Sequence, residues 1–456
     1  MDSTASQLNE AYFGFRPMRA VFSDRQRVQG MLDFEAALAR AQVQAGLVPQ
    51  RFADIISSHC QAQHFDLQAL SQATMLAGNP AIPLVKQLGR LIAAEDEEAE
   101  RYLHFGATSQ DVMDTGLVLQ LRQAVQLLEQ QLAELAGELA RTARAHASTV
   151  MVGRTWLQHA TPITLGMKAA GWLGTVTRHR QRLAELKPRL LCLQLGGAAG
   201  TLAALGESAW PSAQALADEL KLALPEQPWH TQRDRLAELA GWLGSLAGSL
   251  GKLGRDLSLL MQTEVGEVFE PSAPGKGGSS TMPHKRNPVG SAVLISAATR
   301  APGMVATMLS AMAQEHERSL GLWHAEWDTL PELCCLVSGS LAQATQMIGG
   351  LEVDAQRMLV NLEQTLGLNL AEPVSVALAP HLGRHRAHEL LEQCCREAVE
   401  ANLHLRQTLI TRPEVTQHLS IAAIDSLLDP ISYTGQASRW VEHACRDHDQ
   451  FEQGEA

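Results

Sequence analysis

The chain has 456 residues, more than one simple hydrophobic core usually serves, so its length predicts two or three domains or one elongated body. Hydrophobic residues make up 45% of the sequence and aromatic residues only 4%, a balance that favours helices over sheets and predicts an all-α protein. The formal net charge of −12 excludes a general affinity for nucleic acid or anionic membranes, because phosphate groups bind basic surfaces. An anionic substrate must therefore meet a local cationic pocket.

The N-terminal residues and the cysteines predict the cell compartment. Residues 1–10 are polar and lack the basic and apolar regions of a secretory signal, and no run of about 18 apolar residues occurs. The seven cysteines include no C-x-x-C pair and no histidine spacing typical of zinc ligands. We expect buried thiols in a reducing compartment, a cytoplasmic protein outside membranes, and no metal or cofactor.

Proline-free stretches locate the long helices, because proline breaks a helix. Such stretches lie between Pro83 and Pro162, between Pro228 and Pro271, and between Pro331 and Pro373. In the second stretch leucines alternate spacings of three and four from Leu236 to Leu260, and a similar apolar seam runs from Leu121 to Leu139. The seams predict core helices of a bundle, and the five glycines interleaved with the leucine seam predict close helix approach.

The predicted helices suggest an N-terminal helical domain at residues 1–107, a long central helical bundle at 108–360 and a C-terminal helical domain at 361–456. The polar cluster at 108–115 leads into the seam that starts at Leu121, so it should lie at the start of a core helix. Long helices with apolar stripes on more than one side usually need partners from other subunits. The protein is therefore expected to oligomerise.

The most unusual segment runs from Pro274 to Pro288, with the sequence PGKGGSSTMPHKRNP. Its glycines, serines and cations are typical of a long loop whose backbone amides and cations can wrap around an anion. A flexible, solvated linker would not be expected to contain the M-P-H run beside K-R-N. A phosphate-binding Walker loop also fits poorly, because neither Lys276 nor Lys285 is followed by serine or threonine.

From Gly278 to Pro288 this segment resembles the signature loop of the fumarase/aspartase superfamily. Two further segments agree with that superfamily in order and spacing, TSQDVMDT at 108–115 and GRTWLQHATPIT at 153–164. The resemblance covers nearly the whole chain and implies an enzyme that makes or breaks a bond at the carbon β to a substrate carboxylate. It also implies a homotetramer in which segments from three different subunits form each active site.

The resemblance assigns catalytic roles to three residues. Ser279 matches the loop serine proposed as the base that handles the proton α to a carboxylate, and Lys285 matches a group that holds the resulting aci-carboxylate. His159 matches the histidine proposed as general acid in adenylosuccinate lyases, although a histidine in such surroundings is otherwise more often structural. A serine is a weak base, so backbone amides and nearby lysines must lower the pKa of Ser279. The expected substrate-binding residues are Thr108, Ser109, Arg154, Gln158, Lys276, Ser280, Asn287 and Arg318.

Two of the substrate-binding residues also have a structural explanation. Thr108, followed by Asp111, is typical of a helix N-cap with a carboxylate in the first turn, and this role is compatible with substrate binding. Arg318 stands beside Glu315 and Glu317, so an ion pair with one of them and contact with the substrate are open alternatives.

Departures from the superfamily pattern narrow the reaction. Trp156 stands where fumarases and several other branches place a histidine, and residues 77–83 replace a His-Asp motif of adenylosuccinate lyases. The segments 78–85, 104–111 and 314–327 resemble instead the bacterial 3-carboxy-cis,cis-muconate cycloisomerases. This resemblance implies that a substrate carboxylate adds to a double bond of the same molecule and gives a carboxymuconolactone, in the protocatechuate branch of aromatic degradation (the β-ketoadipate pathway).

Intramolecular attack needs no second substrate and no activated water, so orientation can supply much of the acceleration. The implied substrate is a small anionic tricarboxylate, which explains why an acidic protein concentrates cations, Arg286 among them, in these segments. Two alternatives stay open: an adenylosuccinate lyase or a related β-elimination lyase of the same superfamily, and a catalytically silent structural helical protein. The complete set of expected catalytic residues argues against the silent protein.

Overall fold

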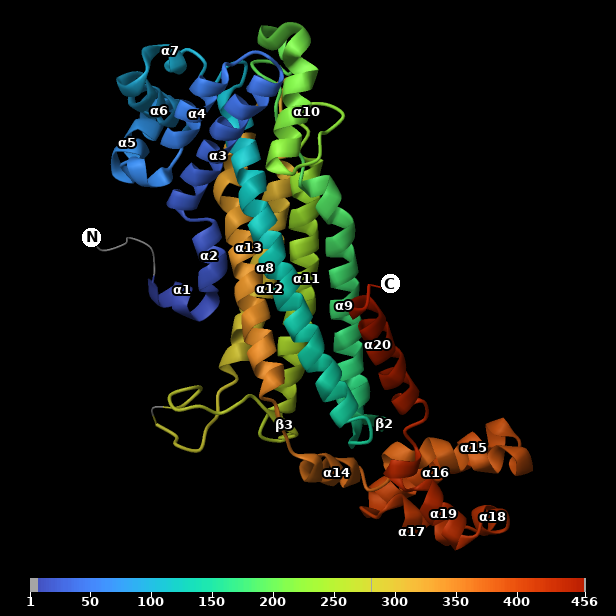
Figure 1. Ribbon diagram of the computed structural model, residues 1–456. Helices are drawn as coiled ribbons and strands as arrows, with labels where there is room; N and C mark the ends of the chain where they lie inside the picture. Colours follow the sequence, from blue (N-terminus) through green and yellow to red (C-terminus); the bar gives the residue numbers. More distant parts are fainter. Residues whose placement is uncertain (1–6, 280, 455–456) are drawn as a thin grey trace. The chain divides into compact units, whose positions relative to one another are not determined.

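The computed structural model describes residues 7–279 and 281–454, and this part of the chain is predominantly helical, as the composition predicted (Figure 1). Ser280, an expected substrate-binding residue, lies outside the described residues. The contacts within the chain separate two compact units. Unit 1 comprises Met1–Leu132, His179–Gly251 and Val293–Ala342, and unit 2 comprises Ala133–Arg178, Lys252–Ala292 and Gln343–Ala456. These units interleave segments of the chain, so the three consecutive domains expected from the sequence stay a prediction.

Five long helices contribute residues to both units. They are α8 (Ser109–Ala145), α9 (Leu165–Leu190), α11 (Asp234–Leu260), α12 (Val289–Ser310) and α13 (Leu322–Gly349). The helices wholly in unit 1 are α1 (Gln7–Phe13), α2 (Arg16–Val21), α3 (Asp24–Gln44), α4 (Gln50–His59), α5 (Leu67–Ala77), α6 (Ala81–Glu95), α7 (Glu97–Glu100) and α10 (Ala209–Leu220), with the 3₁₀ helices η1 (Ala62–His64) and η2 (Ala203–Ser208).

Unit 2 adds the C-terminal helices and the strands. Its helices are α14 (Ala355–Glu363), α15 (Ala371–Leu382), α16 (Arg384–Ala401), α17 (Leu405–Ile410), α18 (Pro413–Thr416), α19 (Ile421–Leu427) and α20 (Ala437–Glu452), with the 3₁₀ helices η3 (Leu368–Leu370) and η4 (Pro430–Ser432). Its strands are β1 (Val150–Thr155), β2 (Gln158–Thr164), β3 (Val268–Phe269) and β4 (Glu352–Val353), which pair antiparallel as β1 with β2 and β3 with β4. These strands were not predicted from the sequence: β3 and β4 have only two residues each, and the turn between β1 and β2 lacks the residues typical of a hairpin turn.

The predicted apolar seams form the core-facing sides of α8 and α11. In α11 the seam leucines from Leu236 to Leu260 are at most 4% exposed, and in α8 the seam from Leu121 to Leu139 is fully buried. Spacings of three and four residues keep these side chains on one face of each helix. The prediction that the seams build the scaffold is confirmed.

Helix α11 approaches α12 closely at two of its glycines. A Cβ atom on Gly244 would lie 2.6 Å from Cγ2 of Val305, and one on Gly251 would overlap the side chain of Ala298. Gly241 and Gly248 face open space instead. Close approach therefore explains the first two glycines and not the other two.

The start of α8 is held by α3, a 21-residue helix of unit 1. Helix α3 packs against α4 and α10. Where α3 crosses α8, a Cβ atom on Gly30 would lie 2.8 Å from the carbonyl oxygen of Gly116, so this contact needs glycine. The crossing holds the first turns of α8, which carry the polar cluster at 108–115.

Candidate active site

Most of the predicted site residues belong to three segments: the start of α8 in unit 1, and the β1–β2 hairpin and the loop before α12 in unit 2. Arg318 lies in the loop between α12 and α13, in unit 1. Among the described residues of unit 2, no hydrogen bond or ion pair joins the hairpin residues Gln158 and His159 to the loop residues Ser279 and Lys285.

The loop between β3 and α12 contains no helix or strand in its described part, as the sequence predicted. A hydrogen bond from the amide of Asn287 to the carbonyl oxygen of Gly277, at 2.8 Å, closes the second half of this loop on itself. Gly277 has a φ of +66°, and a Cβ atom there would lie 2.6 Å from the carbonyl oxygen of Asn287. This position therefore needs glycine for both its backbone conformation and its neighbour.

Ser279 lies within this closed loop, with its hydroxyl oxygen surrounded by backbone amides. Oγ accepts hydrogen bonds from the amides of Met282, at 3.0 Å, and Thr281, at 3.4 Å. Donors that point at an oxygen stabilise its anionic form, which is what a serine base requires. The side chain of Lys285 is exposed, and that of Lys276 is half-buried.

Arg286 anchors the loop to its own unit and is not available as a free cation. Its guanidinium donates to both carboxylate oxygens of Glu352, at 2.8 Å each, and to the carbonyl oxygen of Glu270 at 2.7 Å. The hydrogen bond from Arg286 lowers the pKa of Glu352 to about 2, so this carboxylate is ionised at neutral pH. Arg286 also lies over the ring of Phe269, with 4.9 Å from its guanidinium carbon to the ring centre.

Glu270 ties the other end of the loop to α12. Its carboxylate accepts hydrogen bonds from the amides of Gly290 and Ser291 and from the hydroxyl of Ser291, at 2.8–2.9 Å. A carboxylate at these positions compensates both the free amides and the positive end of the helix dipole. This role of Glu270 was not predictable from the sequence, because no local pattern links position 270 to the first turn of a helix twenty residues later.

The β1–β2 hairpin places Arg154 directly opposite His159 and Thr155 opposite Gln158. The turn between the strands is Trp156–Leu157, with φ of +53° and +63°, and both side chains project into solvent, 96% and 82% exposed. Positive φ values in a two-residue hairpin turn suit asparagine and glycine, so two large apolar residues are strained there. Exposed apolar side chains in a strained turn are typical of surfaces that contact another molecule.

Arg154 is bound to a buried carboxylate of its own unit. Its guanidinium donates to both oxygens of Glu267, at 2.6 and 2.9 Å, and Glu267 is fully buried. Asn361 also donates to Glu267, at 2.8 Å. The expected role of Arg154 in substrate binding stays a prediction, and the substrate would have to use guanidinium hydrogens that Glu267 leaves free.

His159 is half-buried beside this ion pair, and its Nδ1 is buried without a hydrogen-bond partner among the residues described. Burial lowers the pKa of His159, the positive charge of Arg154 lowers it further, and Glu267 opposes the shift. The imidazole is therefore neutral near pH 7. A neutral imidazole can hold a substrate oxygen through a hydrogen bond or accept a proton.

The third segment, at the start of α8, brings Thr108 together with Arg318. Arg318 donates from Nη1 to Thr108 Oγ1 at 3.0 Å and from Nε to Gln110 Oε1 at 2.7 Å. It makes no ion pair with Glu315 or Glu317, which are both described, so the ion-pair alternative is wrong. Ser109 is the first residue of α8 and is partly exposed.

The side chain of Thr108 does not cap α8 as an N-cap residue would; instead the backbone amide of Thr108 is bound by the side chain of Asp111. Asp111 accepts a hydrogen bond from the amide of Thr108 at 3.0 Å, which is one half of a capping box. Within the described part of unit 1, Thr108 Oγ1 receives a hydrogen bond from Arg318 and from no amide of the first helical turn. Because that oxygen accepts from Arg318, its own proton is free to be donated to a substrate carboxylate.

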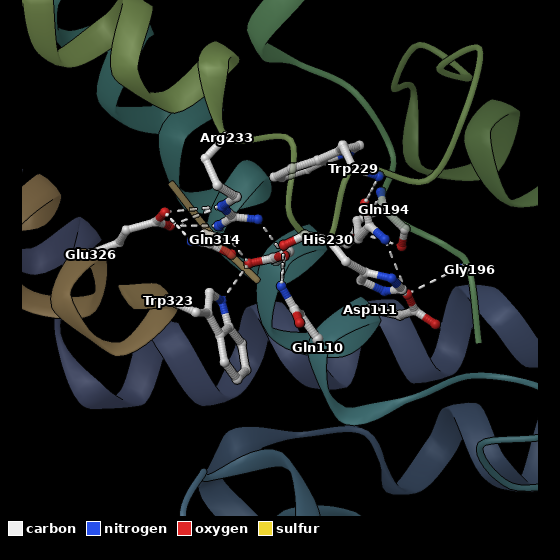
Figure 2. A network of polar contacts seen from close by, with 12 residues as sticks. Gln110, Asp111, Gln194, Gly196, Trp229, His230, Arg233, Gln314, Trp323 and Glu326 are labelled. Carbon is white, nitrogen blue, oxygen red and sulfur yellow. Dashed lines mark hydrogen bonds and ion pairs between the residues drawn. The ribbon is translucent and has the colours of Figure 1, made fainter. Parts of the chain in front are cut away.

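Beneath these residues lies a buried polar network that sequence analysis missed (Figure 2). Asp111 is fully buried and accepts hydrogen bonds from His230 Nε2 at 2.7 Å and from the amides of Gly196 and Gly197 at 3.0 and 2.9 Å. These bonds tie the first turn of α8 to two distant loops. No sequence pattern identified them, since the burial of Asp111 depends on loops about 85 and 120 residues away.

Among residues 7–279 and 281–454, no group of three or more histidine, cysteine, aspartate or glutamate side chains is placed to hold a metal ion.

A family model described as a lyase matches residues 15–303, more than half of the chain. The chain belongs to this lyase family. A model for the C-terminus of adenylosuccinate lyase also matches, over residues 367–444. The superfamily predicted from the loop sequence is thereby confirmed.

Within the lyase family, similarity is high to proteins of one activity. The chain is 66% identical to a 3-carboxy-cis,cis-muconate cycloisomerase of Pseudomonas aeruginosa, over 98% of this chain and 97% of that protein. The crystal structure of a 3-carboxy-cis,cis-muconate lactonizing enzyme from Pseudomonas putida matches with a TM-score of 0.94 at 63% identity, covering 98% of this chain and 100% of that one. A nitrosuccinate lyase of Streptomyces davaonensis is 42% identical over 94% of this chain and 92% of that protein.

Proposed function

We propose that the protein is an enzyme that converts 3-carboxy-cis,cis-muconate to a carboxymuconolactone. The observation that carries this proposal is the 66% identity, over nearly the full length of both chains, to a cycloisomerase of this substrate. The family alone leaves the reaction open, because the nitrosuccinate lyase at 42% identity is also a relative. The reaction belongs to the breakdown of aromatic compounds through protocatechuate.

The reaction is an addition within one molecule. A carboxylate oxygen of the substrate forms a C–O bond at the carbon β to a second carboxylate, and the electron pair of the double bond moves toward that second carboxylate to give its aci form. One proton, added at the α carbon, completes the lactone. The protein must therefore hold three carboxylates in one orientation, stabilise the aci-carboxylate and deliver a proton.

The three segments suit these tasks. The free hydroxyl proton of Thr108 and Arg318, which donates hydrogen bonds to Thr108 and Gln110, can hold one carboxylate. In the loop, Lys285 and Asn287 are proposed to hold the carboxylate that becomes the aci form. Ser279 is proposed to deliver the proton, because the two amides that point at its Oγ stabilise the oxyanion left behind.

His159 is proposed to position the substrate. In the reverse direction the leaving group of this reaction is a carboxylate, which departs without needing a proton, so no general acid is required there. A neutral imidazole, favoured by burial and by Arg154, fits a hydrogen-bonding role. Gln158 and Lys276 are assigned to substrate binding with it.

We also propose that the protein is a homotetramer whose active sites combine segments of different subunits. Helix α12 supports self-association. It is 22 residues long, its most apolar 18 residues have a mean hydropathy of 1.4, and only 28% of those 18 residues are buried within one chain. Its length and composition would also suit a membrane span, a test that core helices of soluble proteins pass as well. The exposed Trp156 and Leu157 give a second apolar surface for a neighbouring copy to cover.

The proposed compartment is the cytoplasm. All seven cysteines are free, and Cys60, Cys192, Cys334, Cys335, Cys394 and Cys445 are buried. Burial raises the pKa of Cys335 and of Cys394 to about 11, so these thiols stay protonated and unreactive at neutral pH. Such thiols suit a reducing compartment.

The second candidate is a β-elimination lyase of the same superfamily that acts on adenylosuccinate or a related substituted succinate. The match of residues 367–444 to the adenylosuccinate lyase C-terminus and the likeness to the nitrosuccinate lyase favour it. A catalytically silent structural protein is less well supported, because Ser279 and its amide donors are all in place.

The deciding experiment is a parallel ultraviolet assay of the purified protein with 3-carboxy-cis,cis-muconate and with adenylosuccinate. We expect the muconate absorbance to fall and adenylosuccinate to stay intact. Cleavage of adenylosuccinate without turnover of the muconate would assign the second candidate. Inertness toward both, in a folded protein, would favour the silent protein.

A further inference from the structure

Gln110 lies between the residues proposed to bind substrate and the buried interior of unit 1. Its side chain is 1% exposed, and its amide nitrogen donates to Asp114 Oδ2 at 3.1 Å and to the carbonyl oxygen of His230 at 2.8 Å. A carboxylate and a backbone carbonyl can only accept hydrogen bonds. The amide of Gln110 therefore has a single satisfied orientation, in which Oε1 faces Arg318.

This orientation fixes the direction of the Arg318 guanidinium. Gln110 Oε1 accepts from Nε at 2.7 Å, Thr108 Oγ1 accepts from Nη1 at 3.0 Å, and no described residue accepts from Nη2. The guanidinium is planar, so two fixed nitrogens determine where the third points. Nη2 and the free hydroxyl proton of Thr108 then offer two donors to one carboxylate.

The partner of Gln110 on the inner side is itself immobile. Asp114 is 2% exposed and accepts from both Nη atoms of Arg233, at 2.7 and 3.1 Å, and from Trp323 Nε1 at 3.1 Å. Arg233 is 2% exposed and also donates to both oxygens of Glu326 (Figure 2). Burial alone would lower the pKa of Arg233, but the two carboxylates raise it, so the charge is permanent.

We propose that Gln110 is a positioning residue for substrate binding, which transmits the fixed geometry of the buried Asp114–Arg233–Glu326 cluster to Arg318 and Thr108. Gln110 is too buried to touch the substrate, and it acts through Arg318. A buried ion cluster contributes little net stability, because the desolvation of the charges offsets their attraction. Its role here is to fix, through Gln110, the direction of the Arg318 guanidinium. The proposal deepens the proposed function and rests on it.

The first test replaces Gln110 by methionine, which has a similar length and neither donates nor accepts strongly. Losing the hydrogen bond to a charged group should raise KM by about 10- to 100-fold and lower kcat much less, because Arg318 binds ground state and transition state alike. The matched control is Gln131→Met. Gln131 lies on the same helix, is 4% exposed, and has its amide satisfied by Ser338.

Both variants lose buried hydrogen bonds, so both should lose thermal stability by similar amounts. Only Gln110→Met should weaken binding of the unreactive 1,2,3-propanetricarboxylate, measured by calorimetry. Equal affinities of the two folded variants for this ligand would overturn the proposal. Muconate turnover by the wild-type protein tests the proposed function separately, so the two ideas can fail independently.

A second test leaves Gln110 in place and removes the guanidinium that Gln110 Oε1 and Thr108 Oγ1 bind. Arg318→Ala should lower kcat/KM by roughly 100-fold, in the range for a lost charge-assisted contact. Methylguanidinium should restore activity saturably, because Gln110 Oε1 and Thr108 Oγ1 stay aimed at the vacated positions, whereas methylammonium lacks the planar fork and should not. If both cations restored activity equally, or neither did, the two acceptor oxygens would not form a preformed guanidinium site.

Discussion

At the scale of single residues, Ser279 and His159 receive different environments from the fold. The hydroxyl oxygen of Ser279 accepts hydrogen bonds from two backbone amides, an arrangement that stabilises negative charge on that oxygen. His159 is desolvated beside the Arg154–Glu267 ion pair, and its pKa is lowered by burial and by Arg154. The first environment suits a residue that moves a proton, and the second suits a neutral group that holds the substrate.

These environments predict unequal effects of substitution. Ser279→Ala should reduce kcat by roughly 10²- to 10⁴-fold, the usual range for losing an acid–base group, with a much smaller change in KM. His159→Asn should retain more activity and show no strong new pH dependence. Steady-state kinetics with the muconate, followed by absorbance across the pH range, measure both. If His159→Asn were the more damaging change and Ser279→Ala were near wild type, the proton-transfer role would pass to His159.

A second residue-scale prediction concerns His104 and Glu35, whose side chains meet at 2.6 Å just before the start of α8. Burial alone would lower the pKa of His104, but the charge of Glu35 and its hydrogen bond raise it overall. A histidine whose pKa is raised in the folded state stabilises the fold fully below its unfolded pKa, near 6.5. That contribution is lost as the pH rises through the folded pKa.

The free energy of unfolding of the wild type should therefore fall as the pH rises above about 6.5, and Glu35→Gln should flatten this fall. Urea unfolding at a series of pH values measures it. Glu95→Gln is the control, because it breaks the more exposed pair of His59 and Glu95. Parallel curves for the wild type and Glu35→Gln would show that the ion pair of His104 has no such role.

At the scale of elements, the loop before α12 depends on one close contact. Gly277→Ala would place a methyl group against the carbonyl oxygen of Asn287 in a left-handed backbone conformation, which costs about 1–2 kcal/mol and reopens the closed loop. Gly275 has a similar φ of +81° but open space around it, so Gly275→Ala carries the same conformational strain without the clash. It is the matched control.

We expect the kcat of Gly277→Ala to be at least about 10-fold lower than that of Gly275→Ala, because the closed loop aims the amides at Ser279. Thermal unfolding should register similar small losses for both variants. Equal kcat values for the two variants would mean that closure through Asn287 does not shape the site.

The elements differ in how far the sequence predicts them. The seams of α8 and α11 were predictable, because a repeat of three and four residues specifies a helix with one apolar face. The loop around Ser279 was predictable from its composition and from its likeness to a known loop. The β1–β2 hairpin was not, because its turn is made of Trp156 and Leu157, where turn chemistry would place asparagine and glycine.

The polar network under α8 could not be predicted either. Asp114, Arg233 and Glu326 come from separate helices or loops, and nothing local marks a charged residue as buried. The sequence predicts Asp111 as an acidic residue in the first turn of α8, and its hydrogen bond from the amide of Thr108 agrees with this. The hydrogen bond between Asp111 and His230 was not predicted. Burial depends on tertiary contacts between distant segments, so local sequence patterns cannot show it.

At the scale of the whole molecule, the proposed tetramer makes activity depend on which subunits supply each segment. If the hairpin with His159 and the loop with Ser279 come to each site from different subunits, a defect in one chain can be offset by another chain. Neither variant chain alone can form a site in which both His159 and Ser279 are intact. A mixed tetramer, however, contains some sites that combine two intact segments.

Refolding His159→Ala and Ser279→Ala chains together should therefore restore activity. With random assembly, about a quarter of the sites would receive an intact hairpin from one chain and an intact loop from the other, so up to about a quarter of wild-type activity is expected. The matched control mixes Ser279→Ala with Lys285→Ala. Both of these changes lie in the same loop, so every loop in the mixture is defective and no gain is expected. Mixed tetramers verified by mass spectrometry that gain no activity in the first pair, or gain as much in the second, would rule out sites shared between subunits in this way.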